Sequence, residues 1–197
     1  MNKAEKTKQY IIEKTAPLFN TKGVAGTSIA NITEATGLTK GSIYGNFENK
    51  DDLAMAAFQY NAISLSMRIE IAVSTKKTAW GKLVAVTDFY RHNYVSISRN
   101  GGCPILNAAV EADDNVPFLK PAVQKSLKRM VARFHDILVE GQDSGEFNPG
   151  LPLQELAYTF VALLEGGIML AQVTEQKKYL EIALDRIITI AKAEICL

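Results

Sequence analysis

The chain has 197 residues, of which 47% are hydrophobic, so it can bury a folded core and is not an intrinsically disordered protein. Its net charge of +1 excludes a protein coated with basic residues, but the charge is unevenly distributed. Residues 1–50 carry seven lysines and four glutamates, whereas the remainder carries 15 basic and 17 acidic residues. We call residues 1–50 the head and the remainder the body. A basic head and a mildly acidic body are typical of a protein whose head binds a polyanion.

The cysteine content and the N-terminal sequence indicate the cellular compartment of the protein. Cys103 and Cys196 are too few for a disulfide framework, and no spacing typical of a metal site is present. The N-terminus is charged throughout and lacks the apolar stretch of a signal peptide. No run of about 18 apolar residues predicts a membrane span. We therefore expect a cytoplasmic protein with no membrane partner, no metal and no cofactor.

The first part of the chain has the apolar spacing of helices. Four helices are predicted here, over residues 3–21, 28–35, 40–46 and 50–74. Gly23 and Gly37 break the chain between them, and Thr27, Thr39 and Asn49 are the expected N-caps. At about 1.5 Å per residue the fourth helix would be roughly 36 Å long, which makes it a strut.

The remainder of the chain continues the helical pattern. Beyond Lys77 it predicts five further helices, near residues 79–98, 103–112, 117–143, 152–172 and 175–194. Clusters of Gly, Pro and Asn separate them, and no strand pairs or repeats are present. We predict an all-α fold of about nine helices in two domains. The boundary is predicted at residue 47, so that residues 1–47 form a three-helix domain and residues 48–197 form a larger helical domain.

Two short helices joined by the turn Thr36-Gly37-Leu38 are typical of a helix-turn-helix motif. A recognition helix needs only about two turns, because it meets base edges near its N-terminal end in the major groove. Cap hydroxyls, small residues and lysines on this surface suit contacts with phosphates and bases. The expected DNA-binding residues are Thr27, Ser28, Thr39, Lys40, Gly41, Ser42, Tyr44, Asn46 and Lys50.

Individual residues of this segment have different expected roles. Lys40 offers its charge to a phosphate or a guanine edge, and Gly41 lets the backbone approach DNA closely. Tyr44 either reaches the sugar-phosphate with its hydroxyl or simply packs against protein. The alternative for the whole segment is an ordinary helical connection with solvated lysines. Short isolated helices are marginal unless packed or bound, which favours the DNA-binding interpretation.

The same residues carry a family resemblance. The stretch TSIANITEATGLTKGSIYGNFENKDDL resembles the DNA-binding segment of TetR/AcrR-family transcriptional regulators, most strongly over residues 8–55. Thr33, where the family usually has alanine, and Gly45-Asn46, where a bulky polar residue is common, depart from the pattern. The resemblance implies a homodimer that binds a palindromic double-stranded DNA operator. It also implies a repressor that a small-molecule effector, held in the body, releases from that operator.

The residues of the body give partial support to dimerisation and to a ligand pocket. Each of the last two predicted helices carries a broad apolar face, which either pairs with a second copy or forms the core of the monomer. Polar and adaptable residues on apolar helices are candidate pocket residues, although each is also compatible with an ordinary core. The candidates are Tyr90, Tyr94, Cys103, Met130, Phe134, Tyr158, Glu165 and Met169.

Other functions remain open at this point. Cys103 follows Gly101-Gly102 near a helix start, where a thiol can become reactive, so a redox- or electrophile-sensing regulator is one alternative. A lone cysteine is more commonly a small buried hydrophobic residue. An activator and a structural helical dimer without a DNA role are further alternatives. An enzyme is not expected, because no metal-ligand cluster, phosphate loop or nucleophile motif appears.

Overall fold

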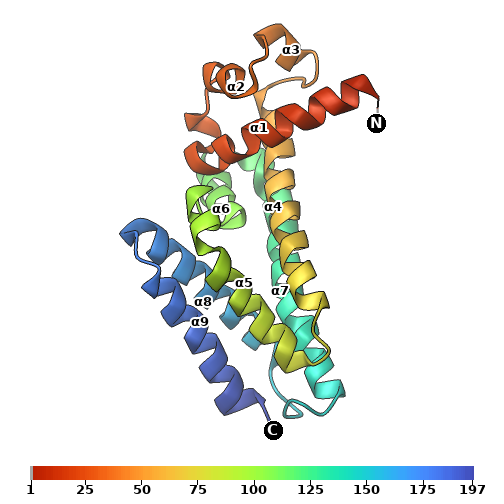
Figure 1. Cartoon of the computed structure of the whole chain (residues 1–197), viewed down its shortest axis with the longest axis vertical. Helices are drawn as coiled ribbons and strands as arrows, with labels where there is room; N and C mark the ends of the chain where they lie inside the picture. Colours follow the sequence, from red (N-terminus) through yellow and green to blue (C-terminus); the bar gives the residue numbers. More distant parts are fainter. Residues whose placement is uncertain (1) are drawn as a thin grey trace. The chain divides into compact units, whose positions relative to one another are not determined.

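The computed structural model describes residues 2–197, apart from the side chain of Asp114. Over these residues the fold is all-α, as predicted, with nine α-helices and no strand (Figure 1). A 3-10 turn, Pro117–Leu119, precedes the seventh helix, and a π-helical turn, Ala191–Ile195, follows the ninth. The helices are α1 Lys3–Gly26, α2 Ile29–Thr36, α3 Lys40–Tyr44, α4 Lys50–Ser74, α5 Ala79–Arg99, α6 Pro104–Asp114, α7 Lys120–Asp143, α8 Leu153–Thr174 and α9 Lys178–Ile190.

Two of the three predicted N-caps are confirmed, and one is wrong. The Thr39 hydroxyl accepts from the backbone N–H of Ser42 at 3.2 Å, and the Asn49 side chain accepts from that of Asp52 at 2.9 Å, as expected of N-caps. The prediction that Thr27 caps α2 is wrong, because the cap is the next residue, Ser28. Threonine and serine adjoin there, and both residue types are good caps, so local preference does not choose between them.

The chain forms two compact units. One comprises residues up to Leu65 together with 100–124, and the other comprises residues 66–99 and 125–197. The division falls inside α4 and α7, and α6 belongs to the same unit as α1, α2 and α3. These two units are defined by the packing of the chain and not by function. The predicted division by function at residue 47 stays a prediction.

The core of the first unit supports α2 and α3. Ile11 of α1, Ile32 of α2 and Ile43 of α3 are almost completely buried, and so is Phe47 beyond α3. Burying each such side chain contributes about 1.5–3 kcal/mol. The phenol of Tyr10 on α1 donates a 2.9 Å hydrogen bond to the carbonyl of the last residue of α2, which fixes the end of α2 on α1.

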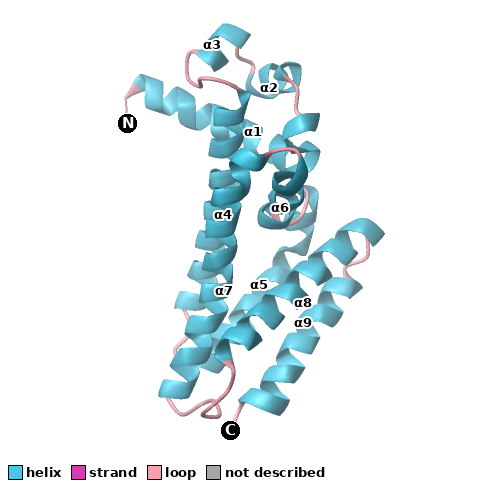
Figure 2. Cartoon of the chain, turned by 180° about the vertical axis from the view of Figure 1, so that it is seen from behind, coloured by secondary structure: helices cyan, strands magenta, loops and turns pink. Residues whose placement is uncertain are grey.

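In the second unit α8 and α9 lie side by side (Figures 1 and 2). Gly167 permits this close packing, because a Cβ atom there would lie 2.6 Å from Cβ of Ala183 on α9. The rings of Phe134 on α7 and Phe160 on α8 make an edge-to-face contact with centroids 5.7 Å apart. The apolar interior of this unit is therefore built from facing helices.

Among the described residues, α8 is one helix that is long and apolar enough to cross a membrane by length and composition. Sequence inspection missed it because Glu165 interrupts the apolar run. Core helices of soluble proteins pass the same test. Ala157, Phe160 and Leu164 of α8 are buried in the second unit, and 39% of the apolar window of this helix is buried.

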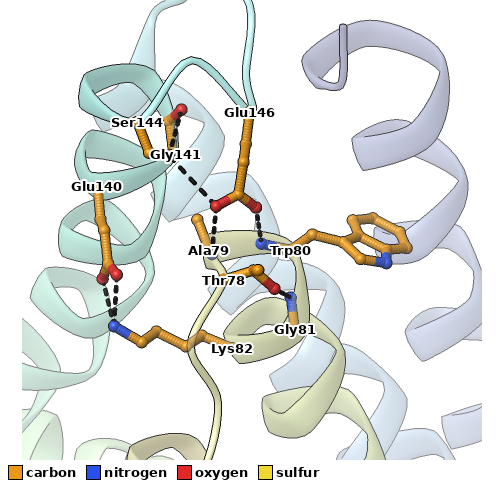
Figure 3. Close-up of polar contacts among 9 residues, drawn as sticks. All are labelled: Thr78, Ala79, Trp80, Gly81, Lys82, Glu140, Gly141, Ser144 and Glu146. Atoms are coloured by element: carbon orange, nitrogen blue, oxygen red, sulfur yellow. Dashed lines mark hydrogen bonds and ion pairs between the residues drawn. The ribbon is translucent and has the colours of Figure 1, made fainter.

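The start of α5 is capped by a residue distant in sequence. The carboxylate of Glu146 accepts from the backbone N–H groups of Ala79 at 3.1 Å and Trp80 at 3.0 Å (Figure 3). The bond from Trp80 is the largest cause that holds the pKa of Glu146 below its ordinary value of 4.5. One turn further, Lys82 pairs with Glu140 of α7 at 2.6 Å. The segment that follows α7 is thus fastened to α5.

The depressed pKa of Glu146 makes stability depend on pH in a defined direction. The ionised carboxylate stabilises the fold above its unfolded pKa, near 4.5, and this contribution is lost as the pH falls below that value. We expect Glu146→Gln to lower the free energy of unfolding by about 1 kcal/mol near pH 7. Denaturant unfolding should show the difference from wild type shrinking as the pH is lowered to about 3.5. The control is Glu34→Gln, at an exposed site; a pH-independent difference for Glu146→Gln would contradict the assignment.

The bend in α1 gives a second prediction on stability. Gly23 has φ 71°, and a Cβ atom there would collide with Oε1 of Glu111 on α6. Gly26, in the same helix, has a negative φ and room for a Cβ. We expect Gly23→Ala to lower the free energy of unfolding by about 1–3 kcal/mol, and Gly26→Ala to leave it unchanged or slightly raised. Thermal unfolding of the two variants measures both, and equal melting temperatures would contradict the prediction.

Candidate nucleic-acid interface

The exposed side of α3 is polar, and its inner side is apolar. Thr39, Lys40, Gly41 and Tyr44 are exposed, whereas Ile43 between them is 1% exposed. Residues 40, 41 and 44 share one side of the helix, because they are one and four positions apart, and the side chain of Ile43 lies next to that side and is buried. Ser42 is half-buried beside this face. The structure therefore brings most of the predicted recognition residues together on one outward surface.

Two side chains of α3 are ordered by their neighbours. The Lys40 ammonium lies 5.9 Å from the centroid of the Tyr44 ring, within the range of a cation–π interaction. Tyr44 itself is 40% exposed, so it does not pack away as an interior residue. The Asn46 side chain donates to the carbonyl of Ser42 at 2.8 Å and thereby closes the C-terminal end of α3. The charge and the phenol are thus held near each other.

The N-terminus of α2 contributes a second polar edge. Ser28 is exposed, and its hydroxyl accepts from the backbone N–H of Asn31 at 3.2 Å. The Asn31 side chain in turn accepts from the backbone N–H of Ser28 at 3.1 Å, which completes a capping box. Sequence reasoning missed Asn31, although the Ser-x-x-Asn spacing resembles the signature of such a box.

Two predicted DNA-binding residues occupy interior positions. Thr27 is fully buried, and its hydroxyl donates to the carbonyl of Gly23 at 2.6 Å. Lys50 is half-buried, and its ammonium donates to the carbonyls of Val24 at 2.8 Å and Thr27 at 3.2 Å. Both residues hold the connection between α1 and α2. No sequence pattern reports such a long-range bond from a lysine to backbone carbonyls.

The predicted ligand-binding residues are only partly brought together. Tyr90 on α5 and Met130 and Phe134 on α7 are buried in the second unit, as are both carboxylate oxygens of Glu165 on α8. Tyr94 is half-buried, and its hydroxyl donates to the carbonyl of Ala171 on α8 at 3.2 Å. The remaining three lie elsewhere: exposed Tyr158 and Met169 on α8, and buried Cys103 in the first unit.

The apolar faces predicted for the last two helices form the chain's own core. Phe160 and Leu164 of α8, and Leu184 and Ile187 of α9, are at most 1% exposed. Other apolar side chains on the same two helices are exposed. They are Tyr158, Met169, Leu170, Val173 and Ile182.

A surface groove of about 430 Å³ opens on the second unit beside α7. Its charged lining comprises Glu70, Lys82, Arg129, Arg133, Asp136 and Glu140. Arg133 donates to the side chain of Ser66 at 2.9 Å, and Lys82 pairs with Glu140. None of the predicted ligand residues lines this groove, because the sequence shows its charges only as solvated helix faces.

The cysteines are poorly placed for redox sensing. Cys103 occupies the N-cap position of α6, as its sequence neighbours indicate, but it is 1% exposed. Burial raises the pKa of the Cys196 thiol, which makes the reactive thiolate scarcer. The described residues also contain no group of three His, Cys, Asp or Glu side chains that would hold a metal ion.

Comparisons with known proteins agree with this geometry. Residues 11–57 match the family model of bacterial regulatory proteins of the tetR family, and residues 79–187 match that of the tetracyclin repressor-like C-terminal domain. The TetR-family regulator from Cytophaga hutchinsonii is 37% identical, with 95% of this chain and 94% of that chain covered and a TM-score of 0.90. The TetR regulator from Chloroflexus aurantiacus is 34% identical, with both chains fully covered and a TM-score of 0.91.

A curated relative extends the comparison. The HTH-type transcriptional repressor DhaR of Mycobacterium sp. (strain GP1) is 25% identical over 174 residues, which are 88% of this chain and 86% of that protein. Both parts of the sequence thus match the same group of regulators. The chain belongs to the TetR family of transcriptional regulators.

Proposed function

We propose that this protein is a ligand-responsive transcriptional repressor, without enzymatic activity, that acts in the cytoplasm. As a homodimer it binds a palindromic operator and leaves it when a small molecule occupies the second unit. The observation that carries the DNA-binding part is the outward surface of α3, where Thr39, Lys40 and Tyr44 are exposed above a buried Ile43. Two copies would read half-sites about 34 Å, one turn of B-DNA, apart.

The buried and exposed positions divide the predicted contact residues into two groups. The first group comprises exposed or half-buried residues that would meet DNA directly. They are Ser28, Thr39, Lys40, Gly41, Ser42, Tyr44 and Asn46. Thr27 and Lys50 would instead position α2, because their polar atoms already bind backbone groups of the same chain. A phosphate contact from Lys50 would require it to release two carbonyls.

The effector site that we propose lies in the interior of the second unit. Tyr90 Oη and both carboxylate oxygens of Glu165 are buried, in a unit whose interior also holds Met130 and Phe134. A few polar atoms in an apolar interior are the usual composition of a small-molecule site. These residues favour an effector with an apolar body and a hydrogen-bonding or cationic group that meets the glutamate.

The experiment that tests the DNA-binding function is selection of bound fragments from random duplexes by the intact protein. We expect an inverted repeat whose half-site centres are about 10 base pairs, or a small multiple of that, apart. Binding should fall steeply with salt, because phosphate contacts release counterions. A structural helical dimer would enrich no sequence, and that result would refute the proposal. Transcription from the selected operator then distinguishes a repressor from an activator.

Substitution of Lys40 tests the recognition surface. Because this ammonium is exposed, we expect Lys40→Ala to weaken operator binding and to reduce the slope of log K against log salt by about one unit. The melting temperature should stay unchanged. Lys125→Ala, at an exposed site in the second unit, is the matched control and should alter neither quantity. Fluorescence anisotropy across a salt series measures both, and identical slopes for all three proteins would refute the contact.

The dimer surface is tested by a matched pair of Leu→Glu variants. Leu170 on α8 is 47% exposed among other exposed apolar residues, and Leu127 on α7 is 38% exposed. We expect Leu170→Glu to shift the protein toward monomer, because a charge would be buried at the interface without a partner. Leu127→Glu should leave the dimer intact. Sedimentation velocity measures the outcome; a dimeric Leu170→Glu at micromolar concentration would place the interface elsewhere.

A further inference from the structure

The connection between α1 and α2 is a short segment, residues 23–27, that is held from two sides. Gly23, with φ 71° and ψ 175°, breaks α1, and a further helical turn leads to Thr27, which immediately precedes the cap of α2. A new helical turn exposes N–H groups at its start and carbonyls at its end, and these need partners from elsewhere. Whatever supplies those partners also sets where α2 begins.

The start of this turn is held by α6. The backbone N–H of Val24 donates to both carboxylate oxygens of Glu111, each at 3.0 Å. A Cβ atom at Gly23 would collide with this carboxylate, so Glu111 would have to move away from Val24. A negative charge at the N-terminal end of a helical turn is also favoured by the helix dipole. Glu111 therefore fills a position that the backbone of α1 leaves open for it.

The end of the same turn is held by α4. The Lys50 ammonium donates to the carbonyls of Val24 and Thr27, at 2.8 Å and 3.2 Å. A carboxylate at the N–H end and an ammonium at the carbonyl end match the direction of the dipole of the turn. Residues 23–27 are thus clamped between α6 and the first residue of α4.

A second set of hydrogen bonds joins the beginning of α6 to α1. The side chain of Asn107 on α6 donates to the carbonyls of Asn20 at 3.1 Å and Gly101 at 2.8 Å. The side chain of Asn20 donates to the carbonyls of Asn100 and Gly102 in the segment before α6. Both the start and the end of α6 are therefore tied to the last turns of α1 (Figure 1).

The residues at the two ends of these bonds come from different family regions. α6 lies inside residues 79–187, which match the C-terminal family model, whereas α1 and Lys50 lie largely inside residues 11–57, which match the DNA-binding one. In the structure, α6 nevertheless belongs to the compact unit of α1 to α3. A displacement of α6 would therefore act directly on the segment from which α2 starts.

We propose that Glu111 is a positioning residue for DNA binding. The carboxylate fixes residues 23–27, and these set the place of Ser28 and of the α2–α3 surface. This inference rests on the proposed DNA-binding function. Loss of a hydrogen bond to a charged group corresponds to a change on the order of tenfold to a hundredfold in an equilibrium, which is the expected loss of operator affinity for Glu111→Ala.

Three variants test the inference in the intact protein. Glu111→Ala removes both acceptors, and Glu111→Gln keeps one acceptor oxygen but removes the charge, so it should retain part of the affinity. Asp113→Asn is the matched control, because Asp113 is exposed on the same helix and pairs with Lys120 at 3.0 Å rather than with α1. Operator affinity, its salt slope and amide hydrogen exchange are measured at a temperature where circular dichroism shows each protein to be folded.

A positioning role predicts a specific combination of results. Operator affinity falls in the order wild type, Glu111→Gln, Glu111→Ala. The salt slope of both variants stays that of wild type, because no phosphate contact is lost. Amide hydrogen exchange becomes faster at Val24 and its neighbours. Asp113→Asn behaves as wild type. Affinity of Glu111→Ala equal to that of wild type, or a loss accounted for entirely by unfolded protein, overturns the inference. If wild type itself shows no salt-dependent operator binding, the proposed function fails instead.

Discussion

Burial of Ile43 is the interaction on which the proposed DNA-binding surface depends. α3 has five residues, and a helix of that length has no stability of its own in water. It persists because Ile43 and Phe47 are buried against the first unit and because Thr39 and Asn46 satisfy its two ends. The outward residues are therefore held only as firmly as this small core beneath them.

Carboxylates distant in sequence cap two helix starts among the described residues. Glu146 accepts from the first N–H groups of α5, and Glu111 accepts from the N–H that follows the break in α1. In each case one charged group both satisfies the backbone and joins two elements, which a local serine or threonine cap does not do. These two caps are thus also tertiary contacts. Glu111 joins α6 to α1, and Glu146 joins the segment after α7 to α5.

Features that depend on near neighbours in the chain could be predicted from the sequence. The nine helices follow from apolar spacing, and the caps Thr39 and Asn49 from their own residue types. Features that depend on packing could not. Lys50 and Thr27 are both expected from the sequence to contact DNA, but the Lys50 ammonium binds two backbone carbonyls and Thr27 is buried. The sequence indicates that α8 and α9 each have an apolar face, but it does not indicate whether the same chain or a second copy covers that face.

The arrangement of α3 separates what holds the helix from what it displays. Ile43 is buried and tolerates little change, whereas Lys40 and Tyr44 are exposed. Substitutions at outward positions would leave the scaffold intact while altering which bases it prefers. Descendants of one ancestral gene could in this way acquire different target promoters through a handful of codon changes.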